Sequence, residues 1–255
     1  MFVAAQGWPP AQTIALILLA MVTSRTTAMC FNRIADWDID QRNPRTADRH
    51  KLVPRGGALV LLVVSAAAFV ATTWWINTLC FRLSPVALAL VFGYSLTKRF
   101  TSFSHFFLGL ALSASPVGAW LAVRGSFAWA PLILALAVLL WVAGFDMIYA
   151  TLDADFDRAA GLHSWAVRRG TDGALRAAMV LHAAAFIVLA VFGVSARLGG
   201  GYWTSLAVIA GALVYEHRVA ARRDVGAVNL AFFHANAVVG LVFVGGIFFD
   251  QVVAR

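Results

Sequence analysis

The sequence predicts an all-α integral membrane protein, and three observations support that fold class. First, 61% of the 255 residues are hydrophobic and only 13% are charged, whereas soluble domains are about half apolar and about a quarter charged. Second, the apolar residues fall into runs of about 20, the length that crosses a hydrocarbon core about 30 Å thick. Third, the basic residues gather in alternate loops between these runs. We expect one membrane domain, residues 1–255.

Glycine, proline and charged residues divide the hydrophobic sequence into eight candidate transmembrane helices. We expect them at 11–31, 57–78, 84–97, 103–123, 127–150, 173–194, 202–216 and 229–249. The third and seventh are the shortest, and we expect them to be tilted or partly irregular. Cys30 and Cys80 lie within or beside apolar runs and are expected to be free thiols.

The distribution of charge predicts the topology. Fifteen of the twenty Lys and Arg residues follow spans one, three, five or seven. By the positive-inside rule these loops face the cytoplasm, which puts both termini on the opposite side. A net charge of +8 would also suit nucleic-acid binding, but the basic residues are confined to short loops. We therefore expect no nucleic-acid partner and no obligatory protein partner.

Two helix ends on the predicted cytoplasmic side are rich in aspartate. In NRIADWDID, the residues spaced four apart share one helical face: Asn32, Asp36 and Asp40. In DMIYATLDADFD, spacings of three and four define a second face: Asp146, Tyr149, Asp153 and Asp157. Asp38 and Asp155 fall off these faces and are left out of the candidate site. Arg25 lies seven residues before Asn32, on nearly the same face and deeper in the membrane.

Three interpretations of the acidic faces remain open. They could be solvated helix ends with interfacial ion pairs, a proton or ion pathway, which buried acids in membranes often mark, or a Mg²⁺ site. Hard cations prefer carboxylate and amide oxygens, and Mg²⁺ typically bridges one or two carboxylates to substrate phosphates. Facing carboxylates also repel each other strongly without a cation between them. Two matching faces on one side, with surplus Arg and Lys, favour the Mg²⁺ site.

The basic loops on the same side suit a diphosphate ligand. NPRTADRHK follows the first acidic face, YSLTKRF ends the third span, and GLHSWAVRRG follows the second acidic face. Arg and Lys would bind the phosphate oxygens that Mg²⁺ does not neutralise. Tyr94 and Lys98 are spaced four apart, so that both side chains share a helical face.

These segments together resemble the UbiA family of intramembrane prenyltransferases. NRIADWDID resembles that family's N-x-x-x-D-x-x-x-D motif, and YATLDADFD resembles its second motif, Y-x-x-x-D-x-x-x-D or D-x-x-x-D. The resemblance extends in order through RTTAMCFN, NPRTADR, YSLTKRF and DADFDRAAGLHS. It implies a single UbiA-like transmembrane domain, a helical bundle around a central cavity that opens sideways to lipid. Family members usually have nine spans, so we expect that the first is missing from this chain.

The resemblance implies Mg²⁺-dependent transfer of a polyprenyl group from a polyprenyl diphosphate to an aromatic acid, with release of diphosphate. The flanks of the two motifs look most like the branch that prenylates 4-hydroxybenzoate in ubiquinone synthesis, and its relatives that prenylate a dihydroxynaphthoate for menaquinone. The expected location is a bacterial-type inner membrane, with the active site on the cytoplasmic side. The alternatives are a family member with another acceptor, a transporter of a cation or phosphorylated solute, and a phosphatidyl-transferring enzyme.

The matching positions imply roles for individual residues. The implied metal ligands are Asn32, Asp36, Asp40, Asp153 and Asp157. Contacts to diphosphate or acceptor are implied for Arg25, Arg45, Tyr94, Lys98, Asp146, Tyr149, Ser164 and Arg168. The expected catalytic residues are Asp36, Asp153 and Arg25. Arg25 is the best buried candidate to bind an acceptor carboxylate, or else it helps to hold diphosphate.

Overall fold

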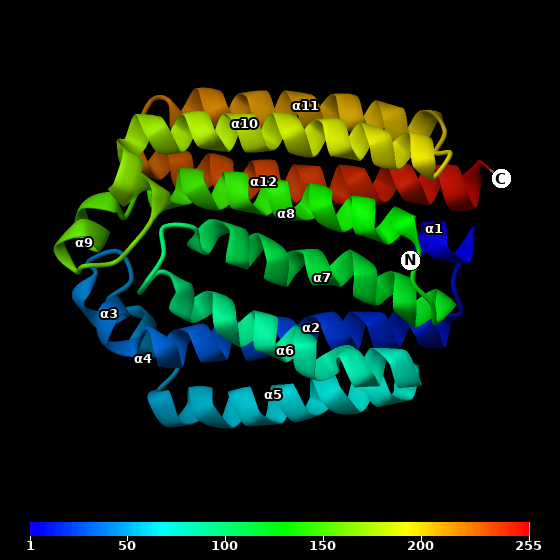
Figure 1. Ribbon diagram of the computed structural model, residues 1–255, viewed down its shortest axis with the longest axis horizontal. Helices are drawn as coiled ribbons and strands as arrows, with labels where there is room; N and C mark the ends of the chain where they lie inside the picture. The colour runs from blue at the N-terminus through cyan, green and yellow to red at the C-terminus, as the bar shows by residue number, and fades with distance from the viewer. Residues whose placement is uncertain (255) are drawn as a thin grey trace.

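The computed structural model of the chain is a bundle of long helices that run side by side (Figure 1). It describes residues 1–254, without the side chains of Arg49 and His50, and the described part contains no β-strand. The long helices are α2 (Ala11–Ala35), α5 (Arg55–Ile76), α6 (Thr78–Thr97), α7 (Ser104–Arg124), α8 (Trp129–Ala150), α10 (Trp165–Ser195), α11 (Gly200–Ala220) and α12 (Val225–Phe248). The short elements are α1 (Phe2–Ala5), α3 (Trp37–Arg42), α4 (Arg49–Leu52), α9 (Ala154–Ala159) and the π-helical turn η1 (Phe249–Val253).

The eight long helices correspond in order to the eight predicted spans, with ends that differ by up to eight residues, at the start of α10. Among the described residues, seven of them are long and apolar enough to cross a membrane, and α11 is the exception. α11 begins with two glycines and ends with polar residues that include Glu216, which lower its mean hydropathy. The expectation that spans three and seven are short or irregular is wrong, because α6 and α11 are complete helices and α6 continues through Pro85.

α10 is interrupted near its start by Gly170, whose φ of 71° and ψ of 170° are not helical. Glycine adopts a positive φ readily because it has no Cβ. The kink separates a short first segment, which carries Trp165 and Arg168, from a long apolar segment that matches the predicted span 173–194.

The short helices α3, α4 and α9 lie together at one end of the bundle, whereas α1 and both chain termini lie at the other (Figure 1). We call the first of these the motif end, because it contains residues 36–52 and 151–165. Both aspartate-rich helix ends are therefore on the same side of the bundle, and the termini are opposite them, as the charge distribution predicted.

Small side chains allow the central helices to approach closely. A Cβ atom on Gly109 of α7 would lie 2.5 Å from the carbonyl oxygen of Leu139 on α8, so only glycine fits there. Close contacts through small residues are typical of helices packed within a membrane.

The outer surface instead carries large apolar side chains, and Trp74, Trp75 and Leu241 are 64%, 68% and 75% exposed. A surface of this kind suits contact with lipid tails.

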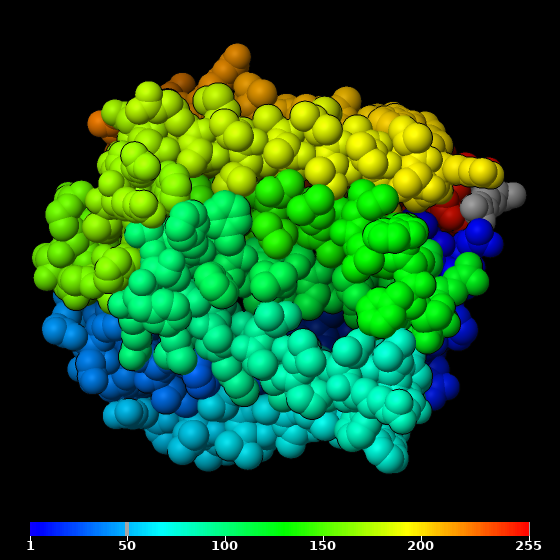
Figure 2. All heavy atoms as spheres, in the orientation of Figure 1, coloured from blue at the N-terminus to red at the C-terminus, as the bar shows by residue number. Residues whose placement is uncertain are grey.

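An opening lies between α6 and α7 in the space-filling view, and dark-blue atoms of α2 are visible at its bottom (Figure 2). An entrance of this kind is what a cavity open to lipid requires.

Cys30 and Cys80 are buried free thiols, which confirms the prediction that the two cysteines form no disulfide.

Candidate functional site

Each aspartate motif lies across a helix break: the first break is at Asp36, and the second spans residues 151–153 between α8 and α9. Asp36 joins α2 to α3 with φ −96° and ψ 13°, and Asp153 has nearly the same conformation, φ −108° and ψ 3°, before α9. The predicted continuous helical faces are therefore wrong in this detail, since the first helix breaks at Asp36 and the second is interrupted over residues 151–153. These angles lie in the sparsely populated bridge region, where many active-site residues are found. The amide of Asp36 still donates to the carbonyl of Asn32, and that of Asp40 to Asp36, both at 2.8 Å.

Asp36 is the buried centre of a first cluster, with 3% of its side chain exposed. The Nζ atom of Lys98 lies 2.9 Å from its Oδ2, and Asn32 Nδ2 donates to the same oxygen at 3.1 Å. Arg99 Nη2 lies 3.6 Å from Oδ1 and also donates to the carbonyl of Ala35, at the break between the helices. Oδ1 itself has no hydrogen-bond partner among the described residues. A buried carboxylate oxygen without a donor is costly, so this atom is suited to bind a cation or ligand.

Asp153 is the centre of a second cluster, in which an arginine forms a bidentate ion pair with the carboxylate. Arg45 Nε donates to Oδ1 at 2.8 Å, and Arg45 Nη2 donates to Oδ2. The third nitrogen, Nη1, donates to the hydroxyl of Tyr149, whose ring centroid lies 4.6 Å from the guanidinium. Asn43 Nδ2 donates to Oδ1 at 3.1 Å. Because Arg45 and Asn43 follow the first motif, these contacts join the two motifs across 108 and 110 residues of sequence.

Asp157 shares this charged region. Burial raises the pKa of Asp157 to about 6, and the negative charge of Asp153 adds to the effect. The positive charges of Lys98 and Arg45 act in the opposite direction. Two carboxylates whose charges disfavour each other are a pair that a bound cation would stabilise.

Asp146 is held by a histidine that the sequence did not indicate as functional. His105 is 2% exposed, and its Nδ1 lies 2.6 Å from Asp146 Oδ2. Its Nε2 accepts a hydrogen bond from the backbone amide of Trp165 at 3.2 Å. Asn43 and Arg99 were also missed in the sequence. Both stand in the basic segments NPRTADRHK and YSLTKRF, but nothing in their spacing distinguished them from the other polar residues there.

Tyr94 and Arg25 extend the site towards the membrane interior. Tyr94 lies within electrostatic range of Asp36, Asp146 and Arg25, and so connects α2, α6 and α8. The expectation that Arg25 is buried is wrong, because its side chain is exposed in the structure. It makes no hydrogen bond or ion pair to the part of the chain that the structure describes. It lies about 10 Å further along α2 than Asn32, given a rise of about 1.5 Å per residue.

Ser164 and Arg168 are not brought to the aspartates. Ser164 Oγ accepts a backbone hydrogen bond at 3.1 Å and caps the start of α10. Arg168 is exposed, and its guanidinium lies 5.9 Å from the ring centroids of Phe103 and Trp165. Their loop is nevertheless fastened to the first cluster, because the residue before Ser164 donates its amide to the carbonyl of Lys98 at 2.7 Å.

The donor atoms of the two clusters suit a hard divalent cation. Within the described residues, no three His, Cys, Asp or Glu side chains are grouped so that they could hold a metal ion; Lys98 and Arg45 neutralise the central aspartates instead. Mg²⁺ usually takes only one or two carboxylates together with substrate phosphates, so a compact group of acids is not required. The unpartnered Oδ1 of Asp36 and the mutual repulsion of Asp153 and Asp157 fit such an ion.

A row of aromatic rings leads from the second cluster into the bundle between α8 and α12. The ring of Tyr149 lies 4.8 Å from that of Phe232, measured between centroids. Phe232 lies 5.3 Å from Phe145, which lies 5.5 Å from Trp141. Ring faces at this position could stabilise a cation close to the aspartates.

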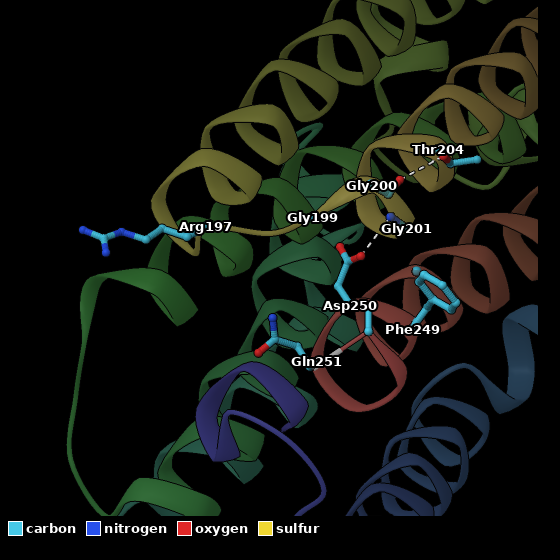
Figure 3. A pocket seen from close by; sticks show the side chains of 10 residues that line it. Arg197, Gly199, Gly200, Gly201, Thr204, Phe249, Asp250 and Gln251 are labelled. Carbon is cyan, nitrogen blue, oxygen red and sulfur yellow. Dashed lines mark hydrogen bonds between the residues drawn. The ribbon is translucent and has the colours of Figure 1, made fainter.

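A pocket of about 600 Å³ lies at the opposite end of the bundle, between the start of α11 and the end of α12 (Figure 3). Its only acidic residue is Asp250, whose two oxygens accept the backbone amides of Gly201 and Tyr202 at 2.8 and 2.9 Å. Asp250 therefore serves as the cap of α11. None of the predicted site residues lines this pocket.

Comparison with known proteins agrees with this arrangement. A sequence model of the UbiA prenyltransferase family matches residues 1–237. A protein from Xanthomonas oryzae pv. oryzae named 4-hydroxybenzoate octaprenyltransferase is 32% identical over 249 residues, which cover 96% of this chain and 83% of the relative. The protein of the same name from Vibrio cholerae is 30% identical over 250 residues, covering 97% and 87%.

Solved structures show the same bundle. The apo structure of a UbiA homolog from Aeropyrum pernix K1 has a TM-score of 0.88 and is 32% identical, covering 98% of this chain and 95% of that one. A UbiA homolog from Archaeoglobus fulgidus bound to GPP and Mg²⁺ has a TM-score of 0.69 at 20% identity, covering 97% and 93%, which is a likeness in fold. The chain therefore belongs to the UbiA prenyltransferase family and is a multi-pass integral membrane enzyme.

Proposed function

We propose that this prenyltransferase transfers a polyprenyl group from polyprenyl diphosphate to an aromatic acid in quinone biosynthesis and releases diphosphate. The observation that carries the proposal is the pairing of each central aspartate with a cation at the motif end, Asp36 with Lys98 and Asp153 with Arg45. The relatives named 4-hydroxybenzoate octaprenyltransferase support 4-hydroxybenzoate, or a related dihydroxynaphthoate, as acceptor. Transport and phosphatidyl transfer are set aside, because the chain belongs to a prenyltransferase family.

Mg²⁺ fits the two motifs as cofactor. We assign one ion to Asn32, Asp36 and Asp40, and a second to Asp153 and Asp157. Bound Mg²⁺ would act as a Lewis acid on the diphosphate oxygens.

The cationic side chains at the motif end would bind the leaving group. Transfer breaks the bond between the allylic carbon and the diphosphate oxygen, and the electron pair stays on that oxygen. Lys98 and Arg45 would stabilise the negative charge that develops there, because a preorganised cation in a water-poor site needs little rearrangement. Ser164 and Arg168 remain candidates for a contact to the outer phosphate, on a loop that is fastened to Lys98.

The aromatic row would protect the allylic cation. The ring faces of Tyr149, Phe232 and Phe145 carry negative electrostatic potential and would exclude water, which otherwise captures the cation. A carbon of the acceptor ring then forms the new carbon–carbon bond, and the proton on that carbon leaves to restore aromaticity.

Arg25 is the group that we assign to the carboxylate of the acceptor. A guanidinium without a partner is expensive inside a membrane, and a bound aromatic acid would supply the missing anion. Because Tyr94 is within electrostatic range of both Arg25 and Asp36, an acceptor bound to Arg25 lies beside Tyr94 and near the first motif. The basic loops at the motif end support an active site on the cytoplasmic side of a bacterial-type inner membrane.

The test is prenyl transfer in membranes that contain the chain, with Mg²⁺, a polyprenyl diphosphate and a panel of aromatic acids. We expect a prenylated product with 4-hydroxybenzoate or a dihydroxynaphthoate, detected by mass spectrometry, and release of diphosphate. Asp36→Asn and Asp153→Asn should abolish it. The matched controls are Asp38→Asn and Asp155→Asn, exposed aspartates of the same motifs, which should remain active. If no acceptor is prenylated by the wild-type chain, the proposal is wrong.

A further inference from the structure

His105 lies where three segments of the motif end meet. It belongs to the first turn of α7, and its side chain is enclosed by the end of α8 and the start of α10. Both ring nitrogens are engaged: Nδ1 with Asp146 Oδ2 at 2.6 Å, and Nε2 with the amide of Trp165 at 3.2 Å. With 2% of its surface exposed, the ring has no other hydrogen-bonding option.

The backbone amide determines which nitrogen carries the proton. An amide N–H can only donate, so Nε2 must accept and carries no hydrogen. The single ring proton of a neutral imidazole is therefore on Nδ1, where it is donated to Asp146. A doubly protonated ring would direct an N–H at the N–H of Trp165. The geometry thus keeps His105 neutral and makes it a donor to Asp146.

This contact leaves one oxygen of Asp146 available. His105 holds Oδ2, whereas Oδ1 has no hydrogen-bond partner among the described residues, and 28% of the side chain is exposed. Tyr94 lies in electrostatic range of Asp146 and of Arg25, on the side that we assign to the acceptor. A carboxylate oxygen there accepts a hydrogen bond from a phenolic hydroxyl, whereas it would repel a diphosphate.

The second contact fastens the loop before α10. Trp165 is the first residue of α10, so its amide has no partner within the helix. His105 supplies that partner, and the carbonyl of Lys98 accepts the amide of His163 at 2.7 Å. The segment that carries Ser164 is therefore attached at two points.

We propose that His105 is a positioning residue: it orients Asp146 so that Oδ1 accepts a hydrogen bond from the hydroxyl of the aromatic acceptor, and it holds the start of α10 for diphosphate binding. The inference rests on the proposed function. It assigns separate tasks to the two ring nitrogens, and these tasks can be separated by substitution.

Two substitutions each retain one nitrogen's function. The amide nitrogen of His105→Asn takes the place of Nδ1 and can still donate to Asp146, but nothing reaches Trp165. The amide oxygen of His105→Gln reaches the place of Nε2 and can accept from Trp165, but Asp146 loses its donor. His105→Phe keeps the approximate ring shape and loses both. His234→Asn is the control, because His234 is an exposed histidine on α12.

The readouts are kcat and the two KM values, measured on variants that elute from size exclusion like the wild type. For His105→Gln we expect kcat to fall, or the KM for the acceptor to rise, by about 10- to 100-fold, the equivalent of one hydrogen bond to a charged group. His105→Asn should instead raise mainly the KM for polyprenyl diphosphate. Two results would overturn the assignment. One is an equal loss in both variants. The other is His105→Phe kinetics within about twofold of wild type, because the loss of one hydrogen bond should have a much larger effect.

A spectroscopic measurement tests the geometry without turnover. In ¹⁵N-histidine-labelled protein, the resonances that disappear in His105→Asn should show a neutral ring protonated at Nδ1. A proton on Nε2, or a charged ring, would contradict the inference. Binding of radiolabelled geranyl diphosphate with Mg²⁺ to wild type and His105→Asn is a second arm that needs no acceptor, and equal affinities would also count against it. If the wild type binds this ligand but prenylates nothing, the proposed function fails while these two results still decide the role of His105.

Discussion

Replacing Arg45 by glutamine removes the cation that joins the two motifs. Glutamine is uncharged and shorter, so both contacts to the Asp153 carboxylate and the donation to Tyr149 are lost. Among the contacts of its side chain to described residues, Asp153 then keeps the 3.1 Å hydrogen bond from Asn43. The loop after the first motif is then attached to the second only through this Asn43 contact.

The free energy of each Arg45–Asp153 contact can be judged from how exposed the two side chains are. Hydrogen bonds to charged groups contribute about 1.5–3 kcal/mol each, and the side chains of Arg45 and Asp153 are 24% and 16% exposed. Residual solvation places the value at the low end of that range, about 1.5 kcal/mol per contact. If Arg45 makes one or two contacts of this strength to diphosphate, their loss should raise the KM for polyprenyl diphosphate by about 10-fold or about 100-fold, at about 1.4 kcal/mol per factor of ten.

The assay is the initial rate of prenyl transfer as a function of polyprenyl diphosphate concentration. Arg45→Lys keeps the charge but not the bidentate contact, so its KM should lie between those of wild type and Arg45→Gln. Arg42→Gln is the matched control on the same segment, since Arg42 is exposed and, within the described part of the chain, its side chain donates to the carbonyl of Asp38 and to no aspartate side chain. A folded Arg45→Gln enzyme with an unchanged KM would refute the reasoning.

Further predictions concern the metal, the acceptor and the core. Asp36→Asn should abolish measurable transfer, a loss of at least about 100-fold, because it removes a ligand of the proposed Mg²⁺ that would stabilise the charge developing on diphosphate; a normal kcat would contradict that role. Chelation with EDTA should abolish transfer and excess Mg²⁺ should restore it, so a rate that survives chelation would exclude the metal. Arg25→Gln should raise the KM for the aromatic acid and not that for the diphosphate, which separate substrate titrations distinguish. Gly144→Ala should lower the melting temperature by several degrees, because its Cβ would lie 2.3 Å from Cδ2 of the buried His182 and overpacking costs about 1–3 kcal/mol; an unchanged melting temperature would show that the ring can move.

The fold class was accessible from composition because the bilayer restricts a chain to helices or closed barrels. The ends of the spans were harder to predict from the sequence where polar residues are buried inside the bundle. The third span was predicted to begin at residue 84, beside Pro85, and the seventh to end at Glu216. Instead, α6 begins at Thr78 and passes through the proline, and α11 continues to Ala220 past the glutamate, which is 2% exposed. Hydropathy describes transfer of a residue to lipid, whereas these side chains are surrounded by neighbouring helices.

The sequence by itself determined that Asn32 and Asp36 lie on one face of α2, where they are hydrogen-bonded, because helical spacing is a local property of about 3.6 residues per turn. It also determined that the two motifs lie at the same end of the bundle, since alternate spans of a membrane protein return to the same side. Only the tertiary structure decided that Lys98 neutralises Asp36, that Arg45 pairs with Asp153, and that both motifs lie across helix breaks that include these aspartates. It alone brought His105 to Asp146. These pairings join residues that are 41 to 108 positions apart, so they depend on how the helices pack and not on any local pattern.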